Sequence, residues 1–168
     1  MGILIENSDV KLVLTEQQDL TFVMEAEADD ENINFVSQWS LDQHLLALSD
    51  EDMIHLVVKN AQHKLVGFVI IRGLSNPNES IELMRIVVTE KGNGYGSEIL
   101  KLIKKWCFEV QNEHRLWLDV VDYNVRALKL YKSQNFVCES VLRECDKYGD
   151  TYNSLIIMSI LKKEYQLQ

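Results

Sequence analysis

The sequence predicts an α/β (α+β) fold, in which helices cover the faces of one mixed sheet within a single domain spanning residues 1–168. Apolar runs of strand length alternate with segments whose apolar residues recur at helical spacing. Two of those runs are separated by the four residues NAQH, which suit a hairpin turn. Apolar residues make up 46% of the chain, it has one proline, and no repetitive tract divides it, so one hydrophobic core is expected.

In the first half of the chain, each expected element has its own signal. VKLVL at 10–14 reads as a strand, and Thr15 is expected to cap a helix in which Leu20, Val23 and Met24 share one face. A second short helix is expected to start after Ser40, with Gln43 completing a capping box. MIHLVVK, KLVGFVIIRG and, after the turn NPNES, IELMRIVV are expected to be strands.

In the second half, a glycine-rich loop is followed by a long helical pattern over about residues 95–112. Its buried face is predicted to hold Ile99, Leu102, Ile103, Trp106 and Val110. RLWLDVV is then expected to be a strand, NVRALKLYKSQN a helix capped by Asn124, and FVCESVLREC and TYNSLIIMSIL two closing strands. The expected order is β-α-α-β-β-β-α-β-α-β-β, which is typical of a mixed sheet with helices on its faces.

Charge and composition exclude several functional classes. The net charge is −9, from 17 Lys and Arg against 26 Asp and Glu, so a nucleic acid or an anionic membrane is not the expected partner. A cationic substrate would be attracted. Three cysteines without a CxxC spacing, and four histidines without an HExxH spacing, predict neither a disulfide framework nor a metal site.

The ends and apolar runs of the chain predict a cytoplasmic protein. Glu6 and Asp9 stand where a signal peptide would need a basic and then an apolar segment. The longest apolar runs, such as LVGFVII, fall far short of the roughly 20 residues that cross a bilayer.

The stretch KGNGYGSEIL places Gly92, Gly94 and Gly96 between a strand and a helix. Such glycines permit torsions and close approaches that side chains forbid, and the first N–H groups of the helix attract an anion. A P-loop is excluded because GxxxxGK[ST] is absent. A dinucleotide fingerprint is disfavoured because the spacing is GxGxG and the loop lies past the middle of the chain, although Asp119 or Asp122 falls where that fold places an acid. A tight turn without a ligand is the remaining alternative.

At this point the chain resembles the GNAT superfamily of N-acetyltransferases. KGNGYGSEIL is similar to the family's (Gln/Arg)-x-x-Gly-x-(Gly/Ala) loop, with Lys91, Gly94 and Gly96 at the motif positions. NVRALKLYKSQNF is similar to Asn-x-x-Ala-x-x-x-Tyr-x-x-x-Gly-Phe through Asn124, Ala127, Tyr131 and Phe136. The order of elements also matches that family's mostly antiparallel sheet flanked by helices.

Two positions depart from the family pattern. Lys91 replaces the usual Gln or Arg, and a lysine is a point charge without the bidentate fork of arginine. Asn135 replaces the usual glycine before Phe136, and asparagine tolerates left-handed torsions better than most residues. Neither change removes the backbone cradle.

The resemblance implies an enzyme that uses acetyl-coenzyme A as a co-substrate, with no metal. The implied coenzyme-binding residues are Ile86, Val87 and Val88 for the pantetheine arm, Lys91, Gly92, Asn93, Gly94, Tyr95, Gly96 and Ser97 for the pyrophosphate, and Asn124 beside the arm. The implied reaction is direct attack of a primary amine on the thioester in a ternary complex. At pH 7, deprotonating a lysine-like amine costs ~4.6 kcal/mol and an α-amine ~1.4 kcal/mol, so a positioned base would help.

Two side chains are the candidate catalytic groups. Tyr131 is expected to act as the general acid toward the leaving thiolate, as the resemblance implies; a core tyrosine covering the sheet is the alternative. Glu82 is expected to be the base or to orient a water molecule; an exposed strand carboxylate, or one paired with Arg85, is the alternative.

The amine acceptor is less closely defined. The acid-rich EAEADDE at 25–31 could attract a polyamine or could be a solvated helix end. NFVSQWSLDQH and the closing YNSLIIMSIL resemble the ribosomal-protein N-terminal acetyltransferase branch, and His44 could line the acceptor pocket or could pack as an ordinary residue. The acceptor therefore stays open between a protein N-terminus, a polyamine and another small amine.

Two other classes compete with an enzyme. One is a coenzyme-binding sensor that has lost turnover, which Lys91 and Asn135 leave open and Tyr131 argues against. The other is a mixed α/β domain whose glycine loop is only a turn. A homodimer formed through the closing strand is also left open.

Overall fold

A computed structural model describes residues 2–168, and of Ile3 the backbone only. The strands are β1 Ile3–Glu6, β2 Val10–Leu14, β3 Met53–Asn60, β4 Leu65–Arg72, β5 Ser80–Val88, β6 Arg115–Val121, β7 Val137–Tyr148 and β8 Thr151–Leu161. The helices are α1 Leu20–Ala28, α2 Leu41–Ser49, α3 Tyr95–Lys105, α4 Val125–Ser133 and α5 Lys162–Tyr165, with a 3-10 turn at Gln17–Asp19 and a π-helical turn at Trp106–Val110. The expected order is confirmed, and β1 and α5 are additions to it.

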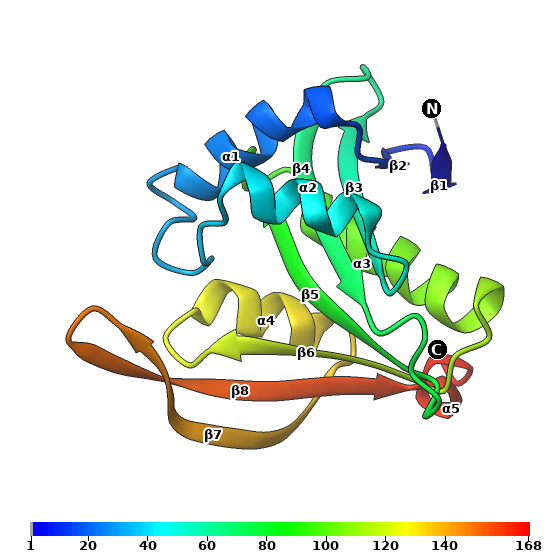
Figure 1. Cartoon of the computed structure of the whole chain (residues 1–168). Helices are drawn as coiled ribbons and strands as arrows, with labels where there is room; N and C mark the ends of the chain where they lie inside the picture. Colours follow the sequence, from blue (N-terminus) through cyan, green and yellow to red (C-terminus); the bar gives the residue numbers. More distant parts are fainter. Residues whose placement is uncertain (1) are drawn as a thin grey trace.

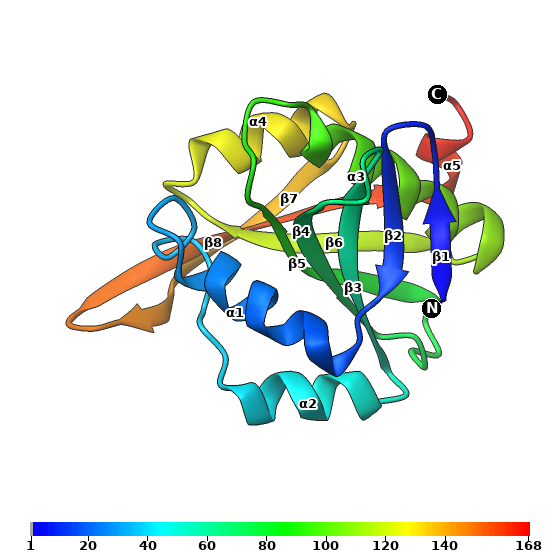
Figure 2. The ribbon, with the colours of Figure 1, turned by 90° about the horizontal axis from the view of Figure 1, so that it is seen from above.

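The strands form one sheet in the order β1-β2-β3-β4-β5-β6-β8-β7, and every neighbouring pair is antiparallel except β5 and β6. The first two helices cover one face of the sheet and α3 and α4 cover the other (Figures 1 and 2). The predicted mixed, mostly antiparallel α/β fold is therefore confirmed. None of the described helices is long and apolar enough to cross a membrane.

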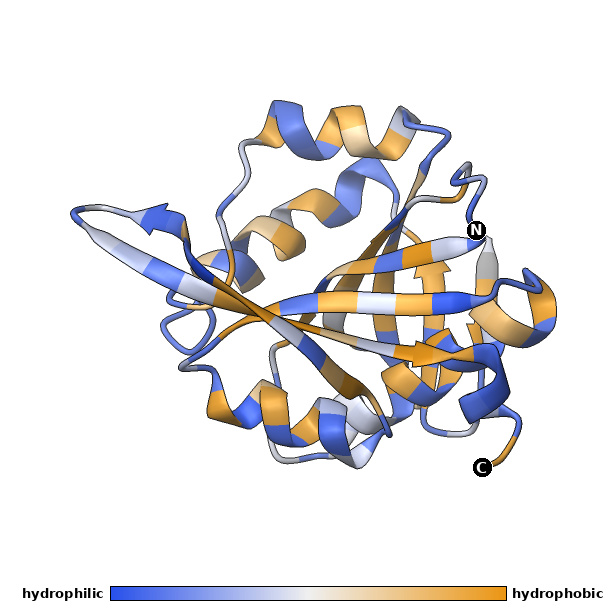
Figure 3. Cartoon of the chain, turned by 90° about the horizontal axis from the view of Figure 1, so that it is seen from below, coloured by the Kyte–Doolittle hydropathy of each residue, from blue (hydrophilic) through white to orange (hydrophobic). Residues whose placement is uncertain are grey.

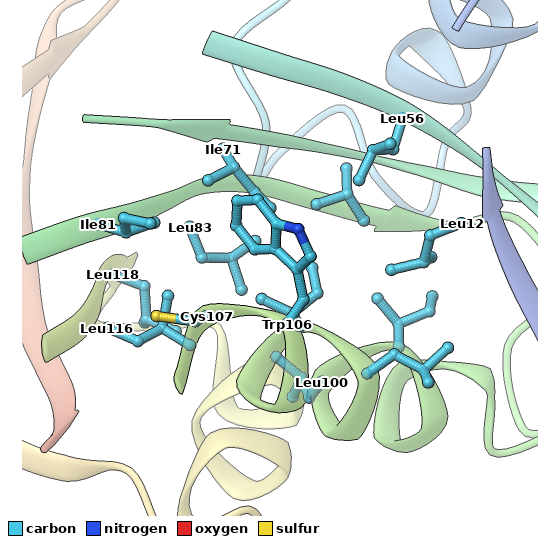
Figure 4. Close-up of a cluster of buried hydrophobic side chains, with 14 of the residues drawn as sticks. Leu12, Leu56, Ile71, Ile81, Leu83, Leu100, Trp106, Cys107, Leu116 and Leu118 are labelled. Atoms are coloured by element: carbon cyan, nitrogen blue, oxygen red, sulfur yellow. The ribbon is translucent and has the colours of Figure 1, made fainter. Parts of the chain in front are cut away.

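Both faces of the sheet are buried against helices. The larger apolar cluster lies under α3 and α4 and is centred on Trp106, which is 2% exposed (Figure 4). The smaller cluster packs α1 against Val57, Phe68 and Ile70 of the central strands. Strands covered on both sides read as continuous apolar runs, as β3 and β4 do.

The hairpin of β7 and β8 differs from the rest of the sheet. It projects beyond the helical layers, and orange and blue residues are mixed along it (Figure 3). Its large apolar side chains that remain exposed are Val137, Val141, Leu142, Tyr148 and Tyr152. Several large apolar side chains of this hairpin are therefore left uncovered by the described residues.

Local signals were right for some element ends and wrong for others. Thr15 does not cap α1: its hydroxyl lies 2.9 Å from His55 Nδ1, and Glu16 starts a 3-10 turn before the helix. Val110 is 62% exposed instead of buried, because the π-helical turn inserts an extra residue per turn and rotates the helix face outward. Asn135 has φ of 67°, the left-handed torsion expected of it.

The capping box of α2 allows a direct test. Ser40 Oγ accepts the N–H of Gln43 at 3.3 Å, and Gln43 Oε1 accepts the N–H of Ser40 at 2.8 Å. We expect Ser40→Ala to lower the free energy of unfolding by about 1 kcal/mol in urea titrations. Ser49→Ala, at the exposed far end of the same helix, should change it by less than about 0.5 kcal/mol. Equal losses in both variants would show that the cap contributes nothing specific.

Candidate functional site: a groove between diverging strands

The groove exists because β5 and β6 pair over a short distance only. Their parallel register covers Ser80 to Glu82 against Arg115 to Trp117, while β5 continues to Val88 and β6 to Val121. The two strands then diverge, as Figure 1 shows, and β6 does not pair with the edge of β5 over residues 84–88. At the end of this edge, the Val88 carbonyl accepts a hydrogen bond from Lys91 Nζ. The opening has a volume of about 990 Å³.

The glycine loop closes one end of this groove. Gly94 is the N-cap of α3 with φ of 77°, a left-handed torsion that favours glycine. A Cβ on Gly96 would lie 2.8 Å from Leu130 Cδ2, so this glycine lets α3 approach α4. The first N–H groups of α3 have no partner within the helix and, with the helix dipole, suit an anionic group such as a pyrophosphate.

Lys91 is directed differently from what its motif position implies. Its ammonium group donates to Asn32 Oδ1 at 2.6 Å and to the Val88 carbonyl at 3.0 Å. Burial, and next the positive charge of Arg126, lower its pKa. Arg126 also lines the groove, so it is an additional cation at this end that sequence reasoning missed.

The other predicted coenzyme residues line the groove with one exception. The groove is lined by Ile86, Val87, Val88, Lys91, Gly92, Gly94, Tyr95, Gly96, Ser97 and Asn124. Asn93 instead lines a separate hollow beside Asp9 and Gln62. Asn124 caps α4 through its Oδ1, which accepts the N–H of Ala127 at 3.2 Å, and this leaves its amide N–H₂ for another partner. The backbone and side chains present therefore fit a coenzyme A molecule.

Tyr131 is buried, at 6% exposure, and still lines the groove. Its ring packs 5.9 Å from that of Phe136, and its hydroxyl makes no hydrogen bond to the described residues. Burial, and next the charge of Asp119, raise the pKa of the phenol. Its proton is therefore retained at neutral pH and remains available to a group in the groove.

Glu82 lies in the groove as an almost buried carboxylate, 6% exposed. Its ion-pair partner is Arg72 of β4, opposite it in the sheet, and not Arg85 of its own strand. The exposed-carboxylate alternative is therefore wrong, and so is the alternative pairing with Arg85. Glu82 Oε1 makes no bond to the described residues and can reach a molecule in the groove.

A β-bulge in β5 decides which side chains share the groove. Leu83 pairs with Ile71 and Arg85 pairs with Ile70, so Met84 is an extra residue without a partner in β4. Glu82 and Arg85, three positions apart, then lie opposite Arg72 and Ile70 and point to the same face. In a regular strand they would point to opposite faces.

Asp119 is a groove residue whose position sequence reasoning did not connect with Glu82. It follows Trp117 by two positions on β6, and Trp117 pairs with Glu82 across the parallel register. Asp119 is exposed to solvent at the mouth of the groove. The partial loss of water around its carboxyl, and next the charge of Glu82, raise its pKa. Asp119 is therefore a stronger base than an ordinary aspartate.

The connector between α1 and α2 forms the opposite wall. Asp30 and Glu31 line the groove, while Glu27 of the same acid-rich run is 1% exposed and bonded to Arg85. His44 is fully buried, with Nδ1 3.1 Å from His55 Nε2, and does not line the groove. Burial, and next the charge of His44, lower the pKa of His55 to about 3.

A groove between diverging strands, with a glycine loop at a helix N-terminus and with Tyr131, Glu82 and Asp119 on its walls, is the site expected of the acyl-coenzyme A-dependent transferases that the sequence resembles. The model of the acetyltransferase (GNAT) family matches residues 14–136, and the chain belongs to that family. It is accordingly an acyltransferase with acetyl-coenzyme A as its co-substrate.

The similar proteins are members of the same superfamily, and their names are those of spermidine acetyltransferases. Spermidine N(1)-acetyltransferase from Vibrio cholerae serotype O1 is 27% identical over 95% of this chain and 96% of its own. Mutant forms of the spermidine/spermine N-acetyltransferase SpeG from Vibrio cholerae match with a TM-score of 0.82 and 26% identity, over 96% of this chain and 98% of theirs. The complex of the Vibrio cholerae enzyme with CoA and spermine matches with a TM-score of 0.85, 24% identity, and 95% and 99% coverage, which shows the fold. These matches support the superfamily and not the predicted closeness to the ribosomal-protein branch.

The raised pKa of Asp119 predicts a gain in stability when its charge is removed. The folded state disfavours the ionised carboxylate, so Asp119→Asn should raise the unfolding free energy at pH 7. The gain should shrink as the pH falls through the raised pKa and vanish below about 3.8, where the carboxyl is protonated in both states. Urea unfolding from pH 7 to 3.5 measures this difference. Asp122→Asn is the control, because Asp122 is also an exposed aspartate but does not line the groove, and an equal gain there would contradict the assignment.

Proposed function

We propose that the enzyme acetylates a primary amine of a polycation such as spermidine. The main support for this proposal is a pair of carboxylates that line the groove where β5 and β6 separate. Glu82 comes from β5 and Asp119 from β6. Asp146 from the β7–β8 hairpin and Asp30 and Glu31 from the connector add negative charge around the same opening. The relatives at 26% and 27% identity, named spermidine acetyltransferases, support this acceptor over a protein N-terminus.

The coenzyme end of the groove carries the opposite charge. The helix N-terminus at Gly94 to Ser97, together with Arg126, would hold the pyrophosphate, and the unpaired edge of β5 at Ile86 to Val88 would receive the pantetheine arm. In this arrangement Lys91 does not contact the pyrophosphate directly, because its ammonium group is hydrogen-bonded to Asn32 and to the Val88 carbonyl. It influences the coenzyme end of the groove through Asn32. Bound acetyl-coenzyme A supplies the thioester that the amine attacks.

The attacking amine must first lose a proton. For a primary amine with a pKa near 10.4, this costs ~4.6 kcal/mol at pH 7. Asp119 receives that proton better than an ordinary carboxylate because the groove raises its pKa. Glu82, oriented by Arg72, holds the ammonium group or the bridging water in place.

Tyr131 faces the same groove with an unbonded hydroxyl and is proposed as the donor to the leaving sulfur. A thiol titrates near 8.5, well below a phenol whose pKa is raised above 10, so complete proton transfer from the phenol to the thiolate is uphill. The phenol therefore stabilises the developing charge through a hydrogen bond, and solvent completes the protonation.

A homodimer through the β7–β8 hairpin accompanies this proposal. The exposed Val141, Leu142, Tyr148 and Tyr152 would be covered by a second copy. The hairpin also carries Asp146 into the groove, so the dimer would steady one wall of the acceptor site. Sedimentation velocity of the wild type and of Leu142→Lys would measure the fraction of dimer.

The sensor alternative receives no support from the relatives, and a cytoplasmic location remains a prediction.

Coenzyme binding is tested by thermal unfolding in the presence of acetyl-coenzyme A. Ligand at about 100 times its dissociation constant should add roughly 2.7 kcal/mol to the stability of the folded state. Gly96→Val should lose most of this gain, because Gly96 and Leu130 both line the groove and a branched side chain would take up space that the coenzyme needs. An unchanged melting temperature of the wild type at millimolar ligand would contradict the proposed site.

The role of Tyr131 is tested by Tyr131→Phe, which keeps the ring in contact with Phe136. Turnover of spermidine, followed as thiol release, should fall by about 10²–10³-fold because the hydrogen bond that stabilises charge on the leaving sulfur is lost. The acetyl-coenzyme A dissociation constant should stay within twofold of the wild type. A variant with normal turnover would identify Tyr131 as a core residue only.

A further inference from the structure

Arg85 is a cation on the wall of a groove that is proposed to receive a cation. It is 8% exposed, lines the groove, and is brought to that face by the bulge at Met84. The indole of Trp39 packs over its guanidinium group, 4.6 Å from the ring centroid. Left unbalanced, its charge would oppose the binding of a polycation, because charges act strongly across a poorly solvated groove.

Glu27 provides the balancing charge from outside the groove. It is 1% exposed, does not line the groove, and its Oε1 accepts a hydrogen bond from Arg85 Nη1. Its Oε2 accepts the backbone N–H of Trp39 at 3.1 Å. The carboxylate therefore holds both the guanidinium group and the aromatic ring that packs over it.

Two histidines, His44 and His55, lie behind Glu27, and they do not change its pairing with Arg85. His44 Nε2 lies 3.2 Å from Glu27 Oε2, which is within ion-pair distance although not aligned as a hydrogen bond, so Glu27 has this imidazole as a second neighbour besides Arg85. Behind it, His55 bonds to His44 and to Thr15, and its lowered pKa keeps it neutral. Among the described residues, Arg85 is thus the only guanidinium group bonded to this carboxylate, and Glu27 is the only acid bonded to Arg85.

We propose that Glu27 is a positioning residue that sets acceptor specificity through Arg85: by pairing with that side chain, it keeps the groove wall electrically neutral and open to polycations. This inference rests on the proposed amine acetylation. It separates two tasks among the acids of the molecule, since Glu82 and Asp119 face the substrate while Glu27 cancels a charge that would repel it.

Removing the charge of Glu27 and removing the charge of Arg85 should have different effects on the KM for spermidine. Glu27→Gln keeps the shape and leaves Arg85 unbalanced, so the KM for spermidine should rise. An unpaired charge about 10 Å from a substrate ammonium, at an effective dielectric of about 20, corresponds to roughly a tenfold change. Arg85→Met removes the cation, so the KM for spermidine should not rise. A loss of packing alone would raise it in both variants.

The experiment measures KM for spermidine and for acetyl-coenzyme A in the full-length wild type, Glu27→Gln, Arg85→Met and the double variant, at low and high salt. We expect Glu27→Gln to raise the spermidine KM about tenfold at low salt and slightly less at high salt, because salt screens the largely buried charge of Arg85 only in part. The KM for anionic acetyl-coenzyme A should stay constant or fall. The double variant should return the spermidine KM toward the wild-type value, since a buried pair replaced by neutral groups is often tolerated.

Glu25→Gln is the matched control, because Glu25 is an exposed glutamate on the same helix. It loses the same formal charge and should leave both KM values unchanged. If Glu27→Gln fails to fold, the double variant and Arg85→Met still decide the question, because a raised spermidine KM in both would overturn the inference.

The two proposals fail in distinguishable ways. A wild type that acetylates spermidine while Glu27→Gln keeps its spermidine KM would overturn the role of Glu27 alone. A wild type that releases no thiol with any amine would overturn the proposed function and this inference with it.

Discussion

The structure depends on one constraint, which is that β5 and β6 are hydrogen-bonded over only three residue pairs. Parallel neighbours normally pair along their length, so strands that separate leave backbone N–H and C=O groups that need another partner. Here these groups face a groove, and an extended thioester arm can satisfy them. The glycine loop follows the far end of β5 and lies beside α4, so the anion site and the tyrosine follow from the same divergence (Figure 2).

The bulge at Met84 determines which charged side chains of β5 face the groove. It places Glu82 and Arg85 on one face of β5, where a regular strand would place them on opposite faces. Each then takes a partner from another element, Arg72 of β4 for Glu82 and Glu27 of α1 for Arg85. The charges of the acceptor end are therefore fixed by contacts between elements that are distant in the sequence.

The sequence predicted those features that depend on nearby residues. Ser40 with Gln43 marked the start of α2, and Asn135 could be assigned a left-handed turn, because capping and torsional preferences act over a few positions. The resemblance to a family located the glycine loop and Tyr131. Only the geometry then showed that Lys91 turns away toward Asn32.

Features that depend on tertiary contacts could not be read in the same way. The run of acids at 25–31 looks uniform, yet its members divide between the groove and the buried pair with Arg85. Thr15 looked like a helix cap because threonine often is one, and the sequence did not show that His55 would lie beside it. Asp119 was noticed in the sequence only as an acid in the place that a dinucleotide-binding fold would require, because its raised pKa depends on a groove formed by other elements.

Hydrogen–deuterium exchange with and without acetyl-coenzyme A tests the central claim most directly, because it reports on the backbone groups that the divergence leaves unpaired. Saturating ligand should slow exchange in peptides covering residues 84–88 and 94–97 and leave residues 80–82, which are already paired, unchanged. Unchanged exchange at residues 84–88 under saturating ligand would contradict the claim that the separated edge of β5 is where the coenzyme binds.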